Sequence, residues 1–121
     1  MIVYKTLSGN CKRIIKKLKE NSFEINGDNI FDFQEGQKFY LLIPTYEENF
    51  IVDAWDFMDI HHKDCLGIIG SGNFNFGDSM FCFTATDMGA EYNIPVVYKI
   101  ENFGNKNDIS QIKKIVNGGI N

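Results

Sequence analysis

Residues suited to phosphate binding follow the first apolar run of the sequence. They read Thr-Leu-Ser-Gly-Asn-Cys at positions 6–11 and lead into a stretch with helical spacing. The hydroxyl groups of Thr6 and Ser8 can donate to phosphate oxygens, and Gly9 lets the backbone approach an anion closely. A helix that begins here would add unpaired N–H groups and a favourable dipole. The segment therefore suits a phosphate monoester, although the residue types also fit Ser8 or Asn10 as a simple helix cap.

A second segment combines aromatic and small polar residues. Positions 44–50 read Pro-Thr-Tyr-Glu-Glu-Asn-Phe. Tyr46 and Phe50 can stack on a planar ring, and Thr45 and Asn49 can bond its polar edge. The alternative is that Phe50 packs beside a helix start and that Tyr46 is a surface ring.

A third segment is rich in glycine. Positions 70–78 hold three glycines and two phenylalanines, so a loop there can wrap a flat ligand with backbone donors and acceptors. It lacks the dinucleotide-binding fingerprint, because Asn75 replaces the third glycine. A glycine-rich turn that covers the edge of the core is the alternative.

Composition narrows the class of protein. The chain has 121 residues, which predicts one domain over 1–121. Its net charge of −4 disfavours a non-specific nucleic-acid binder, because phosphate backbones attract basic surfaces. No apolar stretch approaches the roughly 20 residues of a membrane span, and no secretory signal is evident. We therefore expect a cytoplasmic protein whose partners include neither nucleic acid nor membrane.

The cysteines and histidines give no sign of a metal site or a disulfide framework. Cys11, Cys65 and Cys82 are odd in number and form no Cys-x-x-Cys pair, which argues against a disulfide scaffold, a zinc ribbon or a thioredoxin-type site. His61 and His62 are adjacent, so they seldom converge on one ion. We interpret them as residues that cap the C-terminus of a helix.

Apolar runs alternate with segments of helical periodicity. Runs at 2–4, 39–43, 66–69 and 96–100 predict strands covered on both faces. The stretch 22–33 holds two short candidate strands, 23–25 and 30–33, of which one is expected to form a sheet edge. Four apolar stripes predict helices: Cys11, Ile14, Ile15 and Leu18; Ile51, Ala54, Trp55 and Met58; Phe81, Thr84, Ala85, Met88 and Tyr92; and Ile109, Ile112, Ile115 and Val116, with Asp108 as N-cap.

This alternation predicts an α/β fold. Strand–helix–strand units are right-handed and give parallel sheets. Five strands and four helices in a short chain fit a flavodoxin-like five-stranded parallel sheet of order 2-1-3-4-5 with helices on both faces. Ligands of such sheets bind beyond the carboxyl ends of the strands, and flavodoxin with FMN is itself a known example. Since the three segments all follow strands, we expect them to meet there.

Together the three segments resemble the NrdI family. The shared pattern runs hydroxyl-x-Ser-Gly-Asn, then Thr-Tyr-x-x-Asn-Phe, then Leu-Gly-x-x-x-Ser-Gly-Asn-x-x-aromatic-Gly-Asp. The order, spacing and total length match, and the resemblance covers most of the chain. Its residues here are Thr6, Ser8, Gly9 and Asn10; Thr45, Tyr46, Asn49 and Phe50; and Leu66, Gly67, Ser71, Gly72, Asn73, Phe76, Gly77 and Asp78.

The resemblance implies a non-covalently bound FMN, with the flavin rather than a side chain as the reactive group. It implies reduction by a cellular reductant and reaction with molecular oxygen to give a superoxide- or peroxide-type oxidant. In the family this oxidant reaches the dimanganese site of the class Ib ribonucleotide reductase small subunit and generates the tyrosyl radical cofactor. The chain would then be an accessory flavoprotein rather than a stand-alone enzyme.

By position, the resemblance assigns all three segments to FMN. The first segment would hold the phosphate, mostly through backbone N–H groups, and the other two would flank the ring on either side. The assigned residues are Thr6, Ser8, Gly9, Asn10 and Cys11; Thr45, Tyr46, Glu47, Glu48, Asn49 and Phe50; and Ser71, Gly72, Asn73, Phe76, Gly77 and Asp78.

Glu47 and Glu48 depart from the family pattern, in which small or hydroxyl residues are common. Flavodoxins flip a peptide near the flavin, usually at glycine, and a Glu-Glu step makes a flip into positive φ less favourable by roughly 1 kcal/mol or more. Two carboxylates also oppose negative charge on a reduced flavin. We therefore expect this loop to lower the potential of the second reduction step.

Two other functions stay open. A general flavodoxin-type electron carrier would share the fold, but such carriers usually have strongly acidic surfaces. This chain is mildly acidic and has a basic helix face formed by Lys12, Arg13, Lys16, Lys17 and Lys19. An interaction module without a cofactor also fits, since fold does not fix function.

Overall fold

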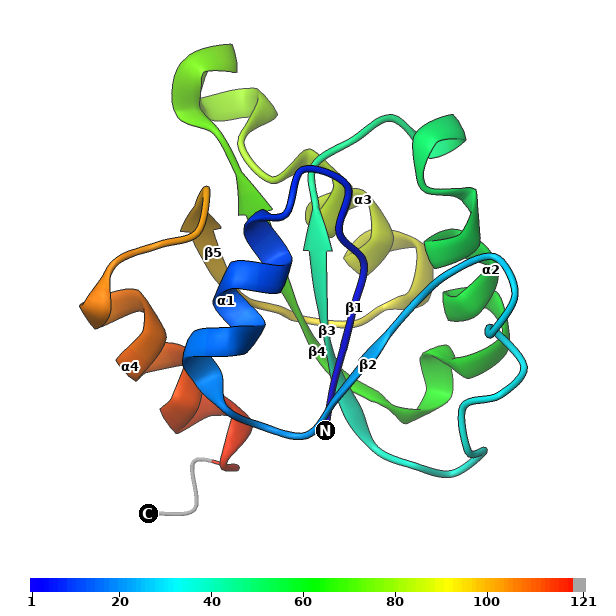
Figure 1. Ribbon diagram of the computed structural model, residues 1–121. Coiled ribbons are helices and arrows are strands. Elements are labelled where there is room, and N and C mark those ends of the chain that lie inside the picture. Colours follow the sequence, from blue (N-terminus) through cyan, green and yellow to red (C-terminus); the bar gives the residue numbers. More distant parts are fainter. Residues whose placement is uncertain (119–121) are drawn as a thin grey trace.

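The apolar runs of the sequence form the strands of one parallel sheet. The computed structural model describes residues 1–118, apart from the side chains of Phe76 and Asp78. The sheet has the order β2-β1-β3-β4-β5, as the sequence predicts (Figure 1). The strands are β1 (Ile2–Tyr4), β2 (Ser22–Glu24), β3 (Phe39–Pro44), β4 (Cys65–Gly72) and β5 (Val96–Glu101).

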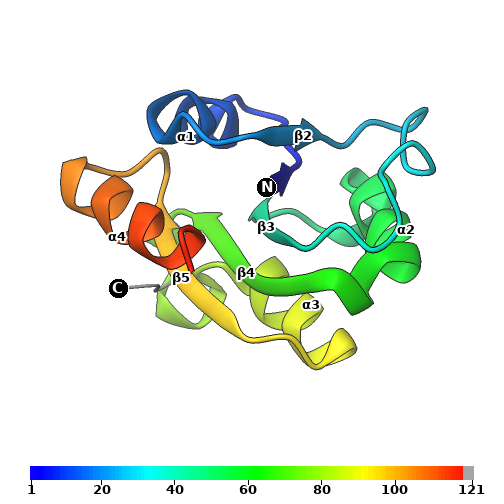
Figure 2. The ribbon, with the colours of Figure 1, turned by 90° about the horizontal axis from the view of Figure 1, so that it is seen from below.

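Helices cover both faces of the sheet. α1 (Asn10–Leu18) and α4 (Lys106–Val116) lie on one face, and α2 (Val52–His61) and α3 (Phe83–Tyr92) lie on the other (Figure 2). Four short 3₁₀ turns connect them: η1 (Glu48–Phe50), η2 (His62–Asp64), η3 (Phe74–Phe76) and η4 (Asp78–Met80). None of the helices in residues 1–118 is long and apolar enough to cross a membrane.

Each face of the sheet has its own core because successive strand residues point to opposite sides. In β3, Leu41 packs in the cluster that α2 and α3 cover, whereas Leu42 packs in the cluster that α1 and α4 cover. Both side chains are almost fully buried. Burial on both faces explains why the strands show no polar alternation in the sequence.

Most residues of the predicted apolar stripes are buried in the helices of the structure. Cys11, Ile14, Ile15 and Leu18 are the buried residues of α1. α2 differs, because it also buries Phe57 and His61, while the predicted Trp55 is only half-buried.

The N-cap of α4 differs from the predicted residue. Asn105, not Asp108, is the N-cap, and its side chain accepts a hydrogen bond from the Asp108 N–H. The Asp108 carboxylate in turn accepts from the Asn105 N–H. Asp108 is therefore the third residue of the helix, at position N3 of a capping box and three positions after the N-cap.

The prediction of a second candidate strand at 30–33 was wrong. Only β2 forms in this region, and residues 30–33 form turns and a bend. Asn29 stabilises the loop, since its side chain accepts from the Asn26 N–H and donates to the Glu24 carbonyl. Phe33 then packs edge-on against Phe39 and Phe57 instead of pairing in the sheet.

Gly70 lets α3 approach β4 closely, and this closeness is testable. A Cβ at Gly70 would lie 2.8 Å from the Ala85 Cβ and 3.0 Å from the Cys82 Cβ. We expect Gly70→Ala to lower the free energy of unfolding by about 1–3 kcal/mol through overpacking. Gly27→Ala is the control, because a Cβ there meets nothing within 4 Å. Urea denaturation measures both, and equal stabilities would contradict this account of the packing.

Candidate ligand-binding site

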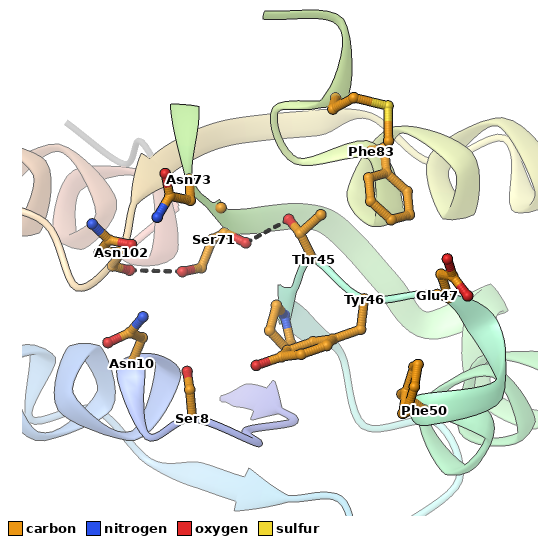
Figure 3. Close-up of a pocket in the computed structure, with 13 residues that line it drawn as sticks. Ser8, Asn10, Thr45, Tyr46, Glu47, Phe50, Ser71, Asn73, Phe83 and Asn102 are labelled. Atoms are coloured by element: carbon orange, nitrogen blue, oxygen red, sulfur yellow. Dashed lines mark hydrogen bonds between the residues drawn. The ribbon is translucent and has the colours of Figure 1, made fainter. Parts of the chain in front are cut away.

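The loops at the carboxyl ends of four strands surround one cleft. Its volume is about 490 Å³, within the usual range for small-molecule sites. Segments that follow β1, β3, β4 and β5 all contribute, together with the start of α3 (Figure 3). The lining residues are Ser8, Asn10, Pro44, Thr45, Tyr46, Glu47, Phe50, Ser71, Gly72, Asn73, Met80, Phe83 and Asn102.

One end of the cleft is polar. Asn10, Asn73 and Asn102 gather there above Ser8 (Figure 3). Gly9 is the N-cap of α1 at φ 95°, and no side chain caps this helix. The alternative prediction, that Ser8 or Asn10 caps this helix, is therefore wrong. Uncapped N–H groups at a helix start favour an anion.

The other end of the cleft is aromatic. Phe50 and Phe83 lie on this side, with Tyr46 between them and the polar end (Figure 3). Phe50 is 61% exposed, which is unusual for a large apolar ring and marks it as available for contact. Thr84 fixes the loop that carries Tyr46, because its Oγ1 accepts from the Tyr46 N–H at 3.0 Å and donates to the Tyr46 carbonyl at 2.8 Å.

A chain of hydrogen bonds joins three strands beneath the cleft. The Thr45 hydroxyl donates to the Ser71 carbonyl at 2.7 Å, and the Ser71 hydroxyl donates to the Asn102 carbonyl at 2.6 Å. The Asn102 N–H returns a bond to the Gly72 carbonyl at 2.8 Å. The ends of β3, β4 and β5 are thus fixed relative to one another before any ligand binds, which lowers the entropic cost of binding.

The charge of the lining is unusual for a phosphate site. Among the described residues that line the cleft, Glu47 is charged and none is lysine or arginine. A phosphate there would be bound by hydroxyl, amide and backbone N–H donors and by the dipole of α1, not by a cation.

The structure brings nine of the predicted site residues into the lining: Ser8, Asn10, Thr45, Tyr46, Glu47, Phe50, Ser71, Gly72 and Asn73. Thr6 instead supports the loop, since its Oγ1 accepts from the Gly9 N–H at 3.1 Å. The Cys11 side chain is buried in the core, so only its backbone could serve a ligand. Glu48, Asn49 and Gly77 are exposed outside the lining, and the side chains of Phe76 and Asp78 lie outside the described residues.

Four lining residues were missed: Pro44, Met80, Phe83 and Asn102. Asn102 follows β5, and the rule that ligands bind at the carboxyl ends of strands could have included it. Its φ of 53° is the left-handed conformation that asparagine tolerates. Met80 and Phe83 carry no such signal, because their place depends on how the chain after β4 folds back.

The side chains of Cys11, Cys82, His61 and His62 are buried in the core or hydrogen-bonded at a helix end. Burial raises the pKa of the Cys11 thiol to about 12 and that of Cys82 to about 11, so both are protonated at neutral pH. The His62 Nδ1 pairs with the Met58 carbonyl at the end of α2, as expected for a capping residue. His61 was wrongly predicted to cap the helix, because its side chain is buried and packs against Phe57 in the core.

Comparison with known proteins agrees with the flavodoxin-like fold. The sequence model of the NrdI flavodoxin-like family matches residues 2–114. The chain is 31% identical to Protein NrdI of Mycoplasma genitalium, over 96% of this chain and 81% of that protein. It is also 31% identical to Protein NrdI of Wigglesworthia glossinidia brevipalpis, over 97% of this chain and 87% of that protein.

Proposed function

The chain belongs to the NrdI flavodoxin-like family, and from this premise we propose that it binds FMN non-covalently and serves the small subunit of a class Ib ribonucleotide reductase. The observation that carries the proposal is the two-ended cleft. An uncapped helix start lies at one end and aromatic rings lie at the other. FMN has the matching form, with a phosphate at one end and a planar ring at the other.

The residues of the cleft divide the binding work. Ser8, Asn10 and the backbone N–H groups at the start of α1 would hold the phosphate. Tyr46, Phe50 and Phe83 would contact the ring and keep water from it. The chemistry that FMN supplies when bound is electron transfer, with a cellular reductant as donor and molecular oxygen as acceptor, and with superoxide or peroxide as the product that the dimanganese subunit uses to form its tyrosyl radical cofactor.

Exposed apolar side chains around the cleft support a partner that covers it. Leu7, Phe74 and Met80 are each 47% exposed, and Phe50 is 61% exposed, all in loops at this edge of the sheet. Apolar residues gathered at a site mouth favour protein contact. We assign this rim to the reductase small subunit.

The setting and extent of the protein are part of the same proposal. All three cysteines are free thiols, which supports a reducing compartment such as the cytoplasm. One sheet takes strands from residue 2 to residue 101, which supports a single FMN-binding domain over 1–121.

FMN binding itself is the first test. We expect the purified chain to bind one FMN and to quench its fluorescence, and to bind riboflavin at least about tenfold more weakly because riboflavin lacks the phosphate. The affinity should depend only weakly on salt, since no lysine or arginine lines the described cleft. A chain that stays colourless in excess FMN would remove the proposal.

The partner is tested at the rim. Leu7→Ser changes an exposed residue outside the cleft lining, so FMN affinity should be unchanged. We expect it to weaken binding to a class Ib reductase small subunit about tenfold, as truncation of a central interface residue commonly does. Phe31→Ser is the control, because Phe31 is 78% exposed but precedes β3 on the chain and is not at the rim. If the parent chain binds FMN but forms no complex, the alternative of a general electron carrier is favoured.

Glu47 is tested through the flavin potential. Glu47 lines the cleft and Glu48 does not, so their matched changes separate a local charge effect from a general one. We expect Glu47→Gln to raise the potential of the second one-electron reduction step, because it removes a negative charge that opposes added electrons. Glu48→Gln should shift it less. Spectroelectrochemical titration measures both, and potentials unmoved by either change would reject the hypothesis.

A further inference from the structure

A nearly buried ion pair joins residues that flank the two loops at opposite ends of the cleft. Lys5 follows β1 and directly precedes the phosphate loop, which we define as residues 6–11. Asp53 lies in the first turn of α2, just after the aromatic loop, defined as residues 44–50. The Lys5 Nζ is 2.6 Å from the Asp53 Oδ2, and the two side chains are only 13% and 18% exposed.

This contact has no substitute between the two loops. Among the described residues, it is the one hydrogen bond that joins positions 5–9 to positions 45–53. The aromatic loop has other ties, because Thr45 bonds β4 and Tyr46 bonds Thr84 of α3. In the part of the chain that the structure describes, the phosphate loop has no such side-chain bond: Cys11 at its end is buried in the core, and just before it the Lys5 N–H donates to the Leu42 carbonyl.

The topology sends the chain after the two loops to opposite faces of the sheet. β1 and β3 are neighbours, but α1 and α2 leave them toward opposite faces of the sheet (Figure 2). Each loop leads into a helix on a different face of the sheet. The spacing between the loops is therefore not set by the sheet alone. A ligand that reaches from one loop to the other depends on that spacing.

The pair is also not optimised as a stabilising contact. The Asp53 Oδ1 is buried and has no hydrogen-bond partner within residues 1–118. Buried ion pairs with an unsatisfied oxygen contribute little net stability, because the desolvation of the charges offsets their attraction. A contribution to stability therefore does not explain why this ion pair lies between the two loops.

We propose that Lys5 and Asp53 are a positioning pair that sets the distance between the phosphate loop and the aromatic loop. The inference rests on the proposed function, since it concerns how this chain recognises both ends of FMN. The pair touches neither end itself, because neither residue lines the cleft. Its effect is to let the phosphate and the ring of one ligand be bound together.

Comparison of two ligands tests the proposal. FMN engages both loops, whereas riboflavin has no phosphate and depends mainly on the aromatic loop. We expect Lys5→Met and Asp53→Asn to weaken FMN binding about tenfold or more while riboflavin affinity stays within about twofold, because loss of spacing affects only a ligand that spans it. Fluorescence titration of each variant measures both dissociation constants. A merely structural role would weaken both ligands together.

A second ion pair provides the matched control. The Lys38 Nζ lies 3.2 Å from the Asp64 Oδ1. Lys38 directly precedes β3 and Asp64 directly precedes β4, so this pair lies at the amino edge of the sheet. Lys38→Met and Asp64→Asn should leave the ratio of FMN to riboflavin affinity unchanged.

The remaining outcomes are decisive as well. If a single change prevents folding, Lys5→Met/Asp53→Leu removes both charges and leaves no buried unpaired ion, and the same loss of FMN preference is expected. Variants that bind FMN as the parent does, or that weaken both ligands equally, would overturn the positioning role alone. A parent that binds no FMN would overturn the proposed function and this inference with it.

Discussion

The divergence of two helices from neighbouring strands determines the rest of this structure. β1 and β3 lie side by side in a parallel sheet, but α1 packs on one face and α2 on the other. The loops that precede these helices must therefore separate at the carboxyl edge of the sheet, and a crevice opens between them. Ser8 and Tyr46, on the loops after β1 and β3, line this crevice.

The electrostatics of the crevice follow from the same geometry. α1 begins at the crevice and no side chain caps it, so its N–H groups are left for an anion. Lys5, which directly precedes the phosphate loop, is paired with Asp53, and none of the described lining residues is a cation. An anion at this end would therefore be bound by fixed dipoles, and the one charged residue of the described lining, Glu47, lies at the aromatic end. This separation keeps the negative charge of Glu47 away from the end of the cleft proposed to hold the phosphate.

Local patterns in the sequence were sufficient wherever burial alone decides the structure. The run Ile2-Val3-Tyr4 and the α1 stripe were predicted because their side chains must leave water. The pattern failed at residues 30–33, where side-chain bonds of Asn29 and the packing of Phe33 replace strand pairing. It also gave no sign of Phe83 or of the Lys5–Asp53 contact, since both depend on residues far apart in the chain. The three predicted loops did converge, because parallel strands end at one edge, but only the folded chain shows which of their side chains face inward.

Convergence of the four loops on one ligand is the central claim, and backbone NMR of the isotope-labelled chain tests it most directly. During titration with FMN, we expect the largest amide shifts together at positions 8–11, 45–50, 71–73 and 102, saturating at one equivalent. Shifts confined to a single loop, or centred on the distant groove between Lys17 and Ile109, would contradict the account.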